Sequence, residues 1–90
     1  MDITEIKVYP VNEDKLKAYV TVTFDNCFVV RDLKVIQGNS RLFVAMPSRR
    51  MKDGSFRDVV HPSNADMRDL LEKKIFEKYN SWFRHPLTFQ

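Results

Sequence analysis

Four cationic side chains gather in one short stretch of the chain, which reads Met-Pro-Ser-Arg-Arg-Met-Lys-Asp-Gly-Ser-Phe-Arg-Asp from residue 46. They are Arg49, Arg50, Lys52 and Arg57. Like charges that face each other across strands repel, and an anion lying between them removes that cost. The stretch therefore predicts a binding site for a polyanion, with phosphate neutralisation as its chemistry. The alternative interpretation is a solvated hairpin tip that binds nothing.

The element that must position these cations is a β-hairpin turning at Asp53-Gly54. This dipeptide is the strongest short-range hairpin signal, and a two-residue turn there pairs Arg50 with Arg57. Side chains alternate along a strand, so Arg50, Lys52 and Arg57 share one face in that register. A longer loop would change the pairs but keep the cations clustered.

The chain length indicates the number of domains, and the distribution of charge indicates where a polyanion would bind. Ninety residues suit one domain. A domain of this size buries only about two-thirds of its unfolded surface, so its stability is expected to be modest, and dimerisation is a common way to increase it. The net charge of +3 arises in the second half: residues 1–45 carry six basic and six acidic side chains, and residues 46–90 carry nine and six. The excess of cations thus coincides with the predicted hairpin.

The sequence favours a cytoplasmic location. We expect neither a secretory signal nor a membrane span, because the N-terminus has no basic region before an apolar core and no apolar run is long enough. The single cysteine, Cys27, cannot form an internal disulfide, and we expect a reduced, packed thiol.

Alternating apolar and polar residues predict strands through the first half of the chain. The clearest run is 16–24. Within a second run, we expect Val29, Leu33 and Val35 to share one face with Arg31. The other predicted strand segments are 6–9, 28–36, 42–46 and 56–61.

From Ser63 the apolar period changes to that of a helix. Ser63 and Asp66 resemble a capping box, and the helix is expected from about residue 64 to about residue 83, with 84–90 as a non-helical tail. The C-terminal end of this helix carries more aromatic side chains than one small sheet would cover, so Trp82 and Phe83 could instead contact a second subunit. The predicted apolar stripe comprises Met67, Leu70, Leu71, Ile75, Phe76, Tyr79, Trp82 and Phe83.

Strands followed by one long helix predict an α+β fold in a single domain spanning residues 1–90. In this fold a mainly antiparallel sheet with a basic hairpin has one face covered by the helix. We expect no catalytic site, cofactor, metal or small-molecule substrate, and therefore no enzyme. The histidines His61 and His85 lack zinc-ligand spacing with the cysteine, and neither a phosphate-binding glycine loop nor a nucleophile elbow is visible.

The run Leu-Phe-Val-Ala-Met-Pro-Ser-Arg-Arg at 42–50, followed by Asp-Gly-Ser-Phe-Arg-Asp-Val-Val-His-Pro at 53–62, is highly specific. It resembles the bacterial SpoVG family, the stage V sporulation protein G or septation proteins. The resemblance covers nearly residues 1–80, whereas the tail after Tyr79 matches no family pattern. It implies a small, dimeric α/β domain, a cytoplasmic regulator that binds DNA, and in some members RNA, and that influences septation, sporulation or virulence genes.

The resemblance also implies roles for individual residues. The family's basic residues after the Met-Pro-Ser step serve nucleic-acid binding, which assigns Arg49 and Arg50 here, with Lys52 in weaker support. The two-residue turn instead pairs Arg49 with Asp58 and points it away from the other cations. The resemblance and the predicted register therefore disagree about Arg49.

The first turns of the family's helix are associated with sequence preference. This implies a contact from Arg68, although Asp66 and Asp69 beside it would repel phosphate. The leading hypothesis is a homodimeric nucleic-acid-binding regulator. The alternative is a protein-interaction module of the division or regulatory machinery, which would use the aromatic helix end and the hairpin without binding nucleic acid directly.

Overall fold

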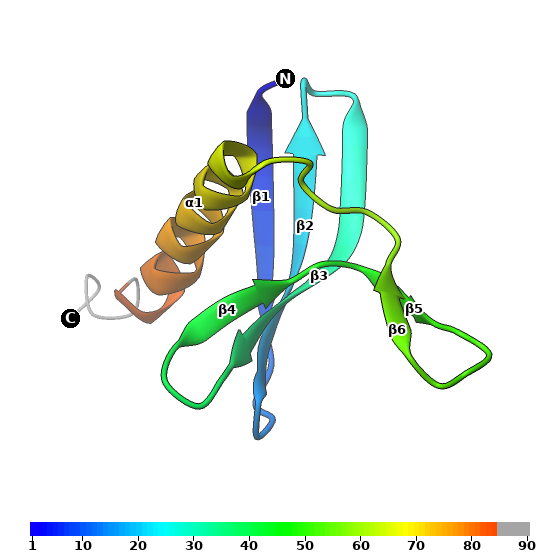
Figure 1. The fold of residues 1–90 in the computed structure, drawn as a ribbon. Helices are drawn as coiled ribbons and strands as arrows, with labels where there is room; N and C mark the ends of the chain where they lie inside the picture. Colours follow the sequence, from blue (N-terminus) through cyan, green and yellow to red (C-terminus); the bar gives the residue numbers. More distant parts are fainter. Residues whose placement is uncertain (85–90) are drawn as a thin grey trace.

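The computed structural model describes residues 1–84, in which strands precede a single helix (Figure 1). Four strands form one antiparallel sheet in the order β1-β2-β3-β4, and β5 pairs with β6 in a separate two-stranded sheet. The elements are β1 (Ile3–Pro10), β2 (Leu16–Phe24), β3 (Phe28–Gln37), β4 (Leu42–Ala45), β5 (Ser48–Arg50), β6 (Phe56–Asp58) and α1 (Ala65–Arg84).

Strand β2 lies at the centre of the core, as its alternating sequence predicts. Ala18, Val20 and Val22 are fully buried. Val20 pairs with Val8 of β1 on one side and with Leu33 of β3 on the other. Apolar side chains thus continue across three strands on the sheet face that α1 covers.

The predicted face of β3 is wrong at the beginning of the strand. Val29 is 47% exposed, whereas Val30 is buried together with Leu33. The register with β2 shifts between Val30 and Leu33, which places Arg31 and Asp32 in a bulge, and Asp32 adopts a φ of 68°. An inserted residue reverses the alternation of side chains beyond it, which explains the error.

The turn between β2 and β3 is formed by Asp25 and Asn26 in the left-handed region. Asp25 and Asn26 have φ values of 50° and 57°, and the Cys27 N–H donates to the Phe24 carbonyl over 3.0 Å. These two residue types tolerate the left-handed conformation. Cys27 is exposed at the corner of this turn, so the prediction of a packed thiol is wrong.

The cap of α1 differs from the predicted capping box. The Asn64 side chain accepts a hydrogen bond from the Met67 N–H over 2.8 Å, so Asn64 and not Ser63 is the N-cap. Asn and Ser are both good N-cap residues, and the sequence offers them side by side. Arg84, assigned to the tail, is the last helical residue, while residues 85–90 and the predicted role of the Phe83 side chain lie outside the described residues.

Helix α1 lies against β1 (Figure 1). Leu71, Ile75 and Tyr79, spaced four residues apart, are buried against the sheet as the stripe predicts. Leu70 and Trp82 are 41% and 48% exposed, so their assignment to the buried stripe is wrong. One helix on one sheet buries only a narrow face, and these two side chains lie beyond it.

The α+β prediction is therefore confirmed: an antiparallel sheet is followed by one helix that covers one of its faces. In the part of the chain that is described, no helix is long and apolar enough to cross a membrane.

Candidate nucleic-acid interface

The β5–β6 hairpin projects from the body of the molecule (Figure 1). Every residue of both strands is exposed, so burial in the core does not hold this hairpin in place. Its base is closed by a hydrogen bond of 2.7 Å from the Val59 N–H to the Pro47 carbonyl. Its shape therefore depends on backbone hydrogen bonds and on the loop that joins the strands.

That loop contains three residues, 52–54, instead of the two that the sequence suggests. The Gly54 N–H donates to the Met51 carbonyl over 3.0 Å, and the Met51 N–H donates to the Ser55 carbonyl over 2.7 Å. Gly54 has a φ of +90°, which residues with a side chain rarely adopt. This combination is the usual three-residue hairpin loop, in which glycine closes the turn.

A carboxylate inside the loop reinforces it. The Asp53 Oδ1 accepts hydrogen bonds from the Ser55 hydroxyl over 2.6 Å and from the Ser55 N–H over 2.9 Å. These bonds stabilise the charged carboxylate and hold the pKa of Asp53 below its ordinary value of 3.8. Asp53 is thus engaged in the turn.

The longer loop moves the register of the hairpin by one residue. Arg49 pairs with Arg57, and Arg50 pairs with Phe56. The predicted pairing of Arg50 with Arg57, and of Arg49 with Asp58, is therefore wrong. Arg49 now shares a face with Arg57, so the register no longer conflicts with the role that the family resemblance implies for Arg49.

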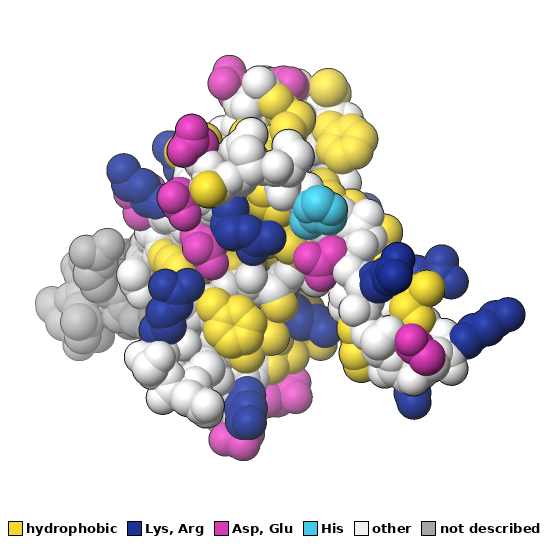
Figure 2. Space-filling view, in the orientation of Figure 1, with side chains coloured by type: hydrophobic (Ala, Val, Ile, Leu, Met, Phe, Trp, Pro, Cys, Tyr) yellow, Lys and Arg dark blue, Asp and Glu magenta, His cyan; other side chains and the backbone are white. Residues whose placement is uncertain are grey.

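The observed register divides the cations between two faces. Arg49 and Arg57 lie directly opposite each other, and directly opposite side chains begin about 4.5–5.5 Å apart at Cβ. Two arginine side chains that start this close can bring their guanidinium groups to one anion between them. Arg50 lies on the other face, and Lys52 is exposed in the loop. Figure 2 shows Lys and Arg side chains in dark blue around the projecting hairpin.

Arg68 lies apart from the hairpin cations, whereas Phe56 lies among them. Arg68, half-buried in the first turns of α1, does not join the hairpin cations, because α1 and β5–β6 lie apart (Figure 1). The candidate residues inferred from the sequence do not include Phe56, which is 69% exposed opposite Arg50. The sequence signal for Phe56 was an aromatic residue next to Arg57 in a basic hairpin, because aromatic rings can stack on nucleic-acid bases.

The described residues hold no group of three or more His, Cys, Asp or Glu side chains able to bind a metal ion. The fold and the hairpin together define a class: a small α+β domain that carries exposed cations on a projecting two-stranded ribbon.

Comparison with known proteins identifies the family. The SpoVG family model matches residues 1–81. A protein of Bdellovibrio bacteriovorus is 67% identical over 79 residues, which cover 88% of this chain and 73% of the relative. A relative from Anaeromyxobacter sp. (strain K) is 60% identical over 80 residues, covering 89% of this chain and 79% of its own. A relative from Caldicellulosiruptor saccharolyticus is 49% identical over 82 residues, which cover 90% of this chain and 93% of the relative. Each relative is named "Putative septation protein SpoVG". The chain belongs to the SpoVG family.

Proposed function

We propose that this protein is a dimeric, cytoplasmic bacterial regulator that binds DNA, and also RNA, through its basic hairpin and thereby affects septation, sporulation or related gene expression. The observation that carries the proposal is the pairing of Arg49 with Arg57 on an exposed, projecting ribbon. The names of its relatives support a link to septation. The proposed role is that of a binding protein, not an enzyme.

The physical basis is phosphate neutralisation. Each Lys or Arg placed beside a phosphate releases condensed counterions, which gives an affinity that falls steeply with salt. The major groove of duplex DNA is wide enough to admit a two-stranded β-ribbon. Arg49 and Arg57 on one face, with Arg50 on the other, would allow the ribbon to contact phosphates on both sides. Such contacts position the protein without reading sequence.

Dimerisation would strengthen this binding. A homodimer carries two hairpins, which doubles the phosphate contacts and sets the spacing of two half-sites. The short chain and its exposed aromatic side chains support a dimer. Sedimentation at micromolar concentration should give the mass of two chains, and a folded monomer would contradict this part of the proposal.

The test of the hairpin is a salt series of binding to duplex DNA. The double variant Arg49→Ala, Arg57→Ala should weaken binding and lower the salt slope by about one unit for each phosphate that the hairpin no longer neutralises. The matched control is Lys73→Ala, which removes an exposed cation from α1. An unchanged slope in a folded double variant would exclude the hairpin as the site.

One observation favours a second candidate function. Phe56 and Val59 are 69% and 61% exposed on and beside the hairpin. An apolar surface of this kind suits a protein partner of the division machinery. Binding through it would depend little on salt, so the same salt series separates the two functions.

A further inference from the structure

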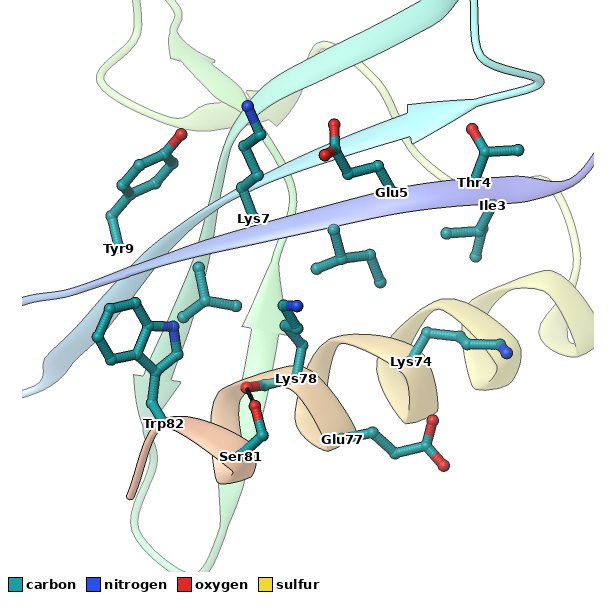
Figure 3. A pocket seen from close by; sticks show the side chains of 12 residues that line it. Ile3, Thr4, Glu5, Lys7, Tyr9, Lys74, Glu77, Lys78, Ser81 and Trp82 are labelled. Atoms are coloured by element: carbon teal, nitrogen blue, oxygen red, sulfur yellow. Dashed lines mark hydrogen bonds between the residues drawn. The ribbon is translucent and has the colours of Figure 1, made fainter. Parts of the chain in front are cut away.

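The sheet face that turns away from α1 carries aromatic rings and lysines. One row crosses all four strands: Tyr9 pairs with Tyr19, Tyr19 with Lys34, and Lys34 with Ala45. Figure 3 shows the side chains of Lys7 and Tyr9 on the side of β1 opposite α1. We call this surface the open face; its central residues are Lys7, Tyr9, Tyr19, Lys34, Phe43 and Ala45.

The aromatic rings of the open face are available to a ligand. Tyr9, Tyr19 and Phe43 are 53%, 38% and 37% exposed. Tyr9 and Tyr19 come from adjacent strands, which lie about 4.8 Å apart. Phe43 lies against the turn after β3, where a Cβ on Gly38 would come within 3.2 Å of its ring. Glycine there lets the Phe43 ring rest on the backbone, which holds this ring at the edge of the open face.

The charges of the open face favour an anionic ligand. Lys7 and Lys34 lie beside Tyr9 and Tyr19 on this face. Glu5 is a carboxylate on the same face of β1, next to Lys7. The bulge in β3 adds Arg31 and Asp32, whose opposite charges offset each other. Lys17, on the same face, donates from its ammonium group to the carbonyl of Asp14 over 2.8 Å and so fixes the loop before β2. The open face therefore keeps a net positive charge after Glu5 offsets one lysine, with Lys7 exposed and Lys34 half-buried beside the rings.

We propose that the open face binds single-stranded RNA, with unpaired bases stacked on Tyr9 and Tyr19 and phosphates beside Lys7 and Lys34. Stacking needs base faces that a duplex keeps hidden, and a basic surface with interspersed aromatic rings is the usual platform for single strands. The phenolic hydroxyls add groups that can bond a 2′-hydroxyl. This inference rests on the proposed nucleic-acid binding and deepens it, because it adds to the hairpin a second surface that takes single-stranded RNA.

The experiment measures binding of a fluorescent single-stranded RNA of about 12 nucleotides, near the site size of comparable surfaces. The double variant Tyr9→Ser, Tyr19→Ser should bind it about tenfold more weakly or worse, while duplex DNA binding is unchanged. Tyr9→Phe, Tyr19→Phe keeps both rings and should retain most of the affinity. Circular dichroism checks that each variant is folded.

A matched control removes an aromatic ring from a different surface. Phe28 is 61% exposed at the turn between β2 and β3, where it pairs with Phe24 of the core-facing row of β2. Phe28→Ser should leave RNA binding unchanged. Lys34→Gln should reduce the salt slope for the single strand by about 0.7, the value for one phosphate contact.

Four results would overturn the inference. Unchanged RNA affinity in the serine variant, with weakened RNA binding in Arg49→Ala, Arg57→Ala, would leave the hairpin as the RNA site and the open face without a role in RNA binding. A serine variant that becomes monomeric but keeps its RNA affinity would make the open face a contact between copies. Equal, tyrosine-dependent binding of single-stranded DNA would remove RNA as the specific occupant. A parent protein that binds neither RNA nor duplex DNA would overturn the proposed function as well, whereas tyrosine-dependent RNA binding without duplex binding would overturn only the hairpin's role.

Discussion

The four-stranded sheet and the β5–β6 hairpin are both antiparallel, but different forces fix their registers. In the sheet, Val20 and Val22 are fully buried, and a slip of one residue would turn them to solvent. In the hairpin every strand residue is exposed, so no burial opposes a slip. The loop around Gly54 alone selects which arginines face each other. Core positions therefore follow from apolar periodicity, whereas the geometry of the candidate site depends on turn chemistry.

The largest effect should follow from a charge placed in the sheet–helix core. Leu71 and Ile75 are 5% and 0% exposed. Truncation of a buried leucine alone costs about 2–5 kcal/mol, and an unpaired buried carboxylate adds to that cost. Leu71→Asp or Ile75→Asp should therefore unfold the domain, as measured by thermal denaturation. The control Lys73→Asp, on the exposed side of α1, should melt close to the parent.

The next effect is on binding and tests the hairpin register. Arg49 faces Arg57, whereas Arg50 faces Phe56. A hydrogen bond to a charged group is worth about 1.5–3 kcal/mol, so Arg49→Ala should weaken duplex DNA binding about tenfold. Arg50→Ala should weaken it less, because it leaves the pair of arginines intact. A greater effect of Arg50→Ala, with both variants folded, would contradict the observed register as the binding geometry.

A smaller effect should arise at the glycine of the loop. Nothing lies within 4 Å of a Cβ built on Gly54, so a substitution there meets no steric clash. Its φ of +90° nevertheless costs a residue with a side chain about 1–2 kcal/mol. Gly54→Ala should accelerate hydrogen exchange at the Met51 amide without lowering the melting temperature of the core. A large drop in melting temperature would mean that hairpin and sheet unfold together.

The smallest effect concerns pH. Hydrogen bonds from Ser55 lower the pKa of Asp53, so their contribution to the turn is fully present above pH 3.8 and disappears as pH falls through the lowered pKa. Ser55→Ala removes the hydroxyl bond, which is the main cause, and should raise the pKa of Asp53 toward 3.8. A carboxyl NMR titration measures this shift. An unchanged pKa would show that the hydroxyl does not support the turn.

Much of the fold was predictable because long periodic segments carry strong signals. The alternation around Val20 and the four-residue spacing from Leu71 to Ile75 both identify buried faces. The bulge at Asp32 was not predictable, since it depends on a single left-handed residue. The helix start was ambiguous because Ser63 and Asn64 can both act as caps.

The candidate site was predictable in composition but not in geometry. The cluster of hairpin cations is evident from the sequence. The Asp53-Gly54 dipeptide, however, fits both a two-residue loop with glycine second and a three-residue loop with glycine last. A difference of one residue exchanges the faces of Arg49 and Arg50. The open face was missed for another reason: its tyrosines lie far apart in sequence and meet only through strand pairing.

The central claim is that the basic hairpin contacts nucleic acid, and an NMR titration of the labelled protein with duplex DNA tests it most directly. The backbone amide signals of residues 48–58 should shift first and most, and added salt should reverse the shifts. Signals from the buried strands and from Lys73 in α1 should change little. Shifts confined to α1 or to the sheet, with residues 48–58 unaffected, would contradict the account.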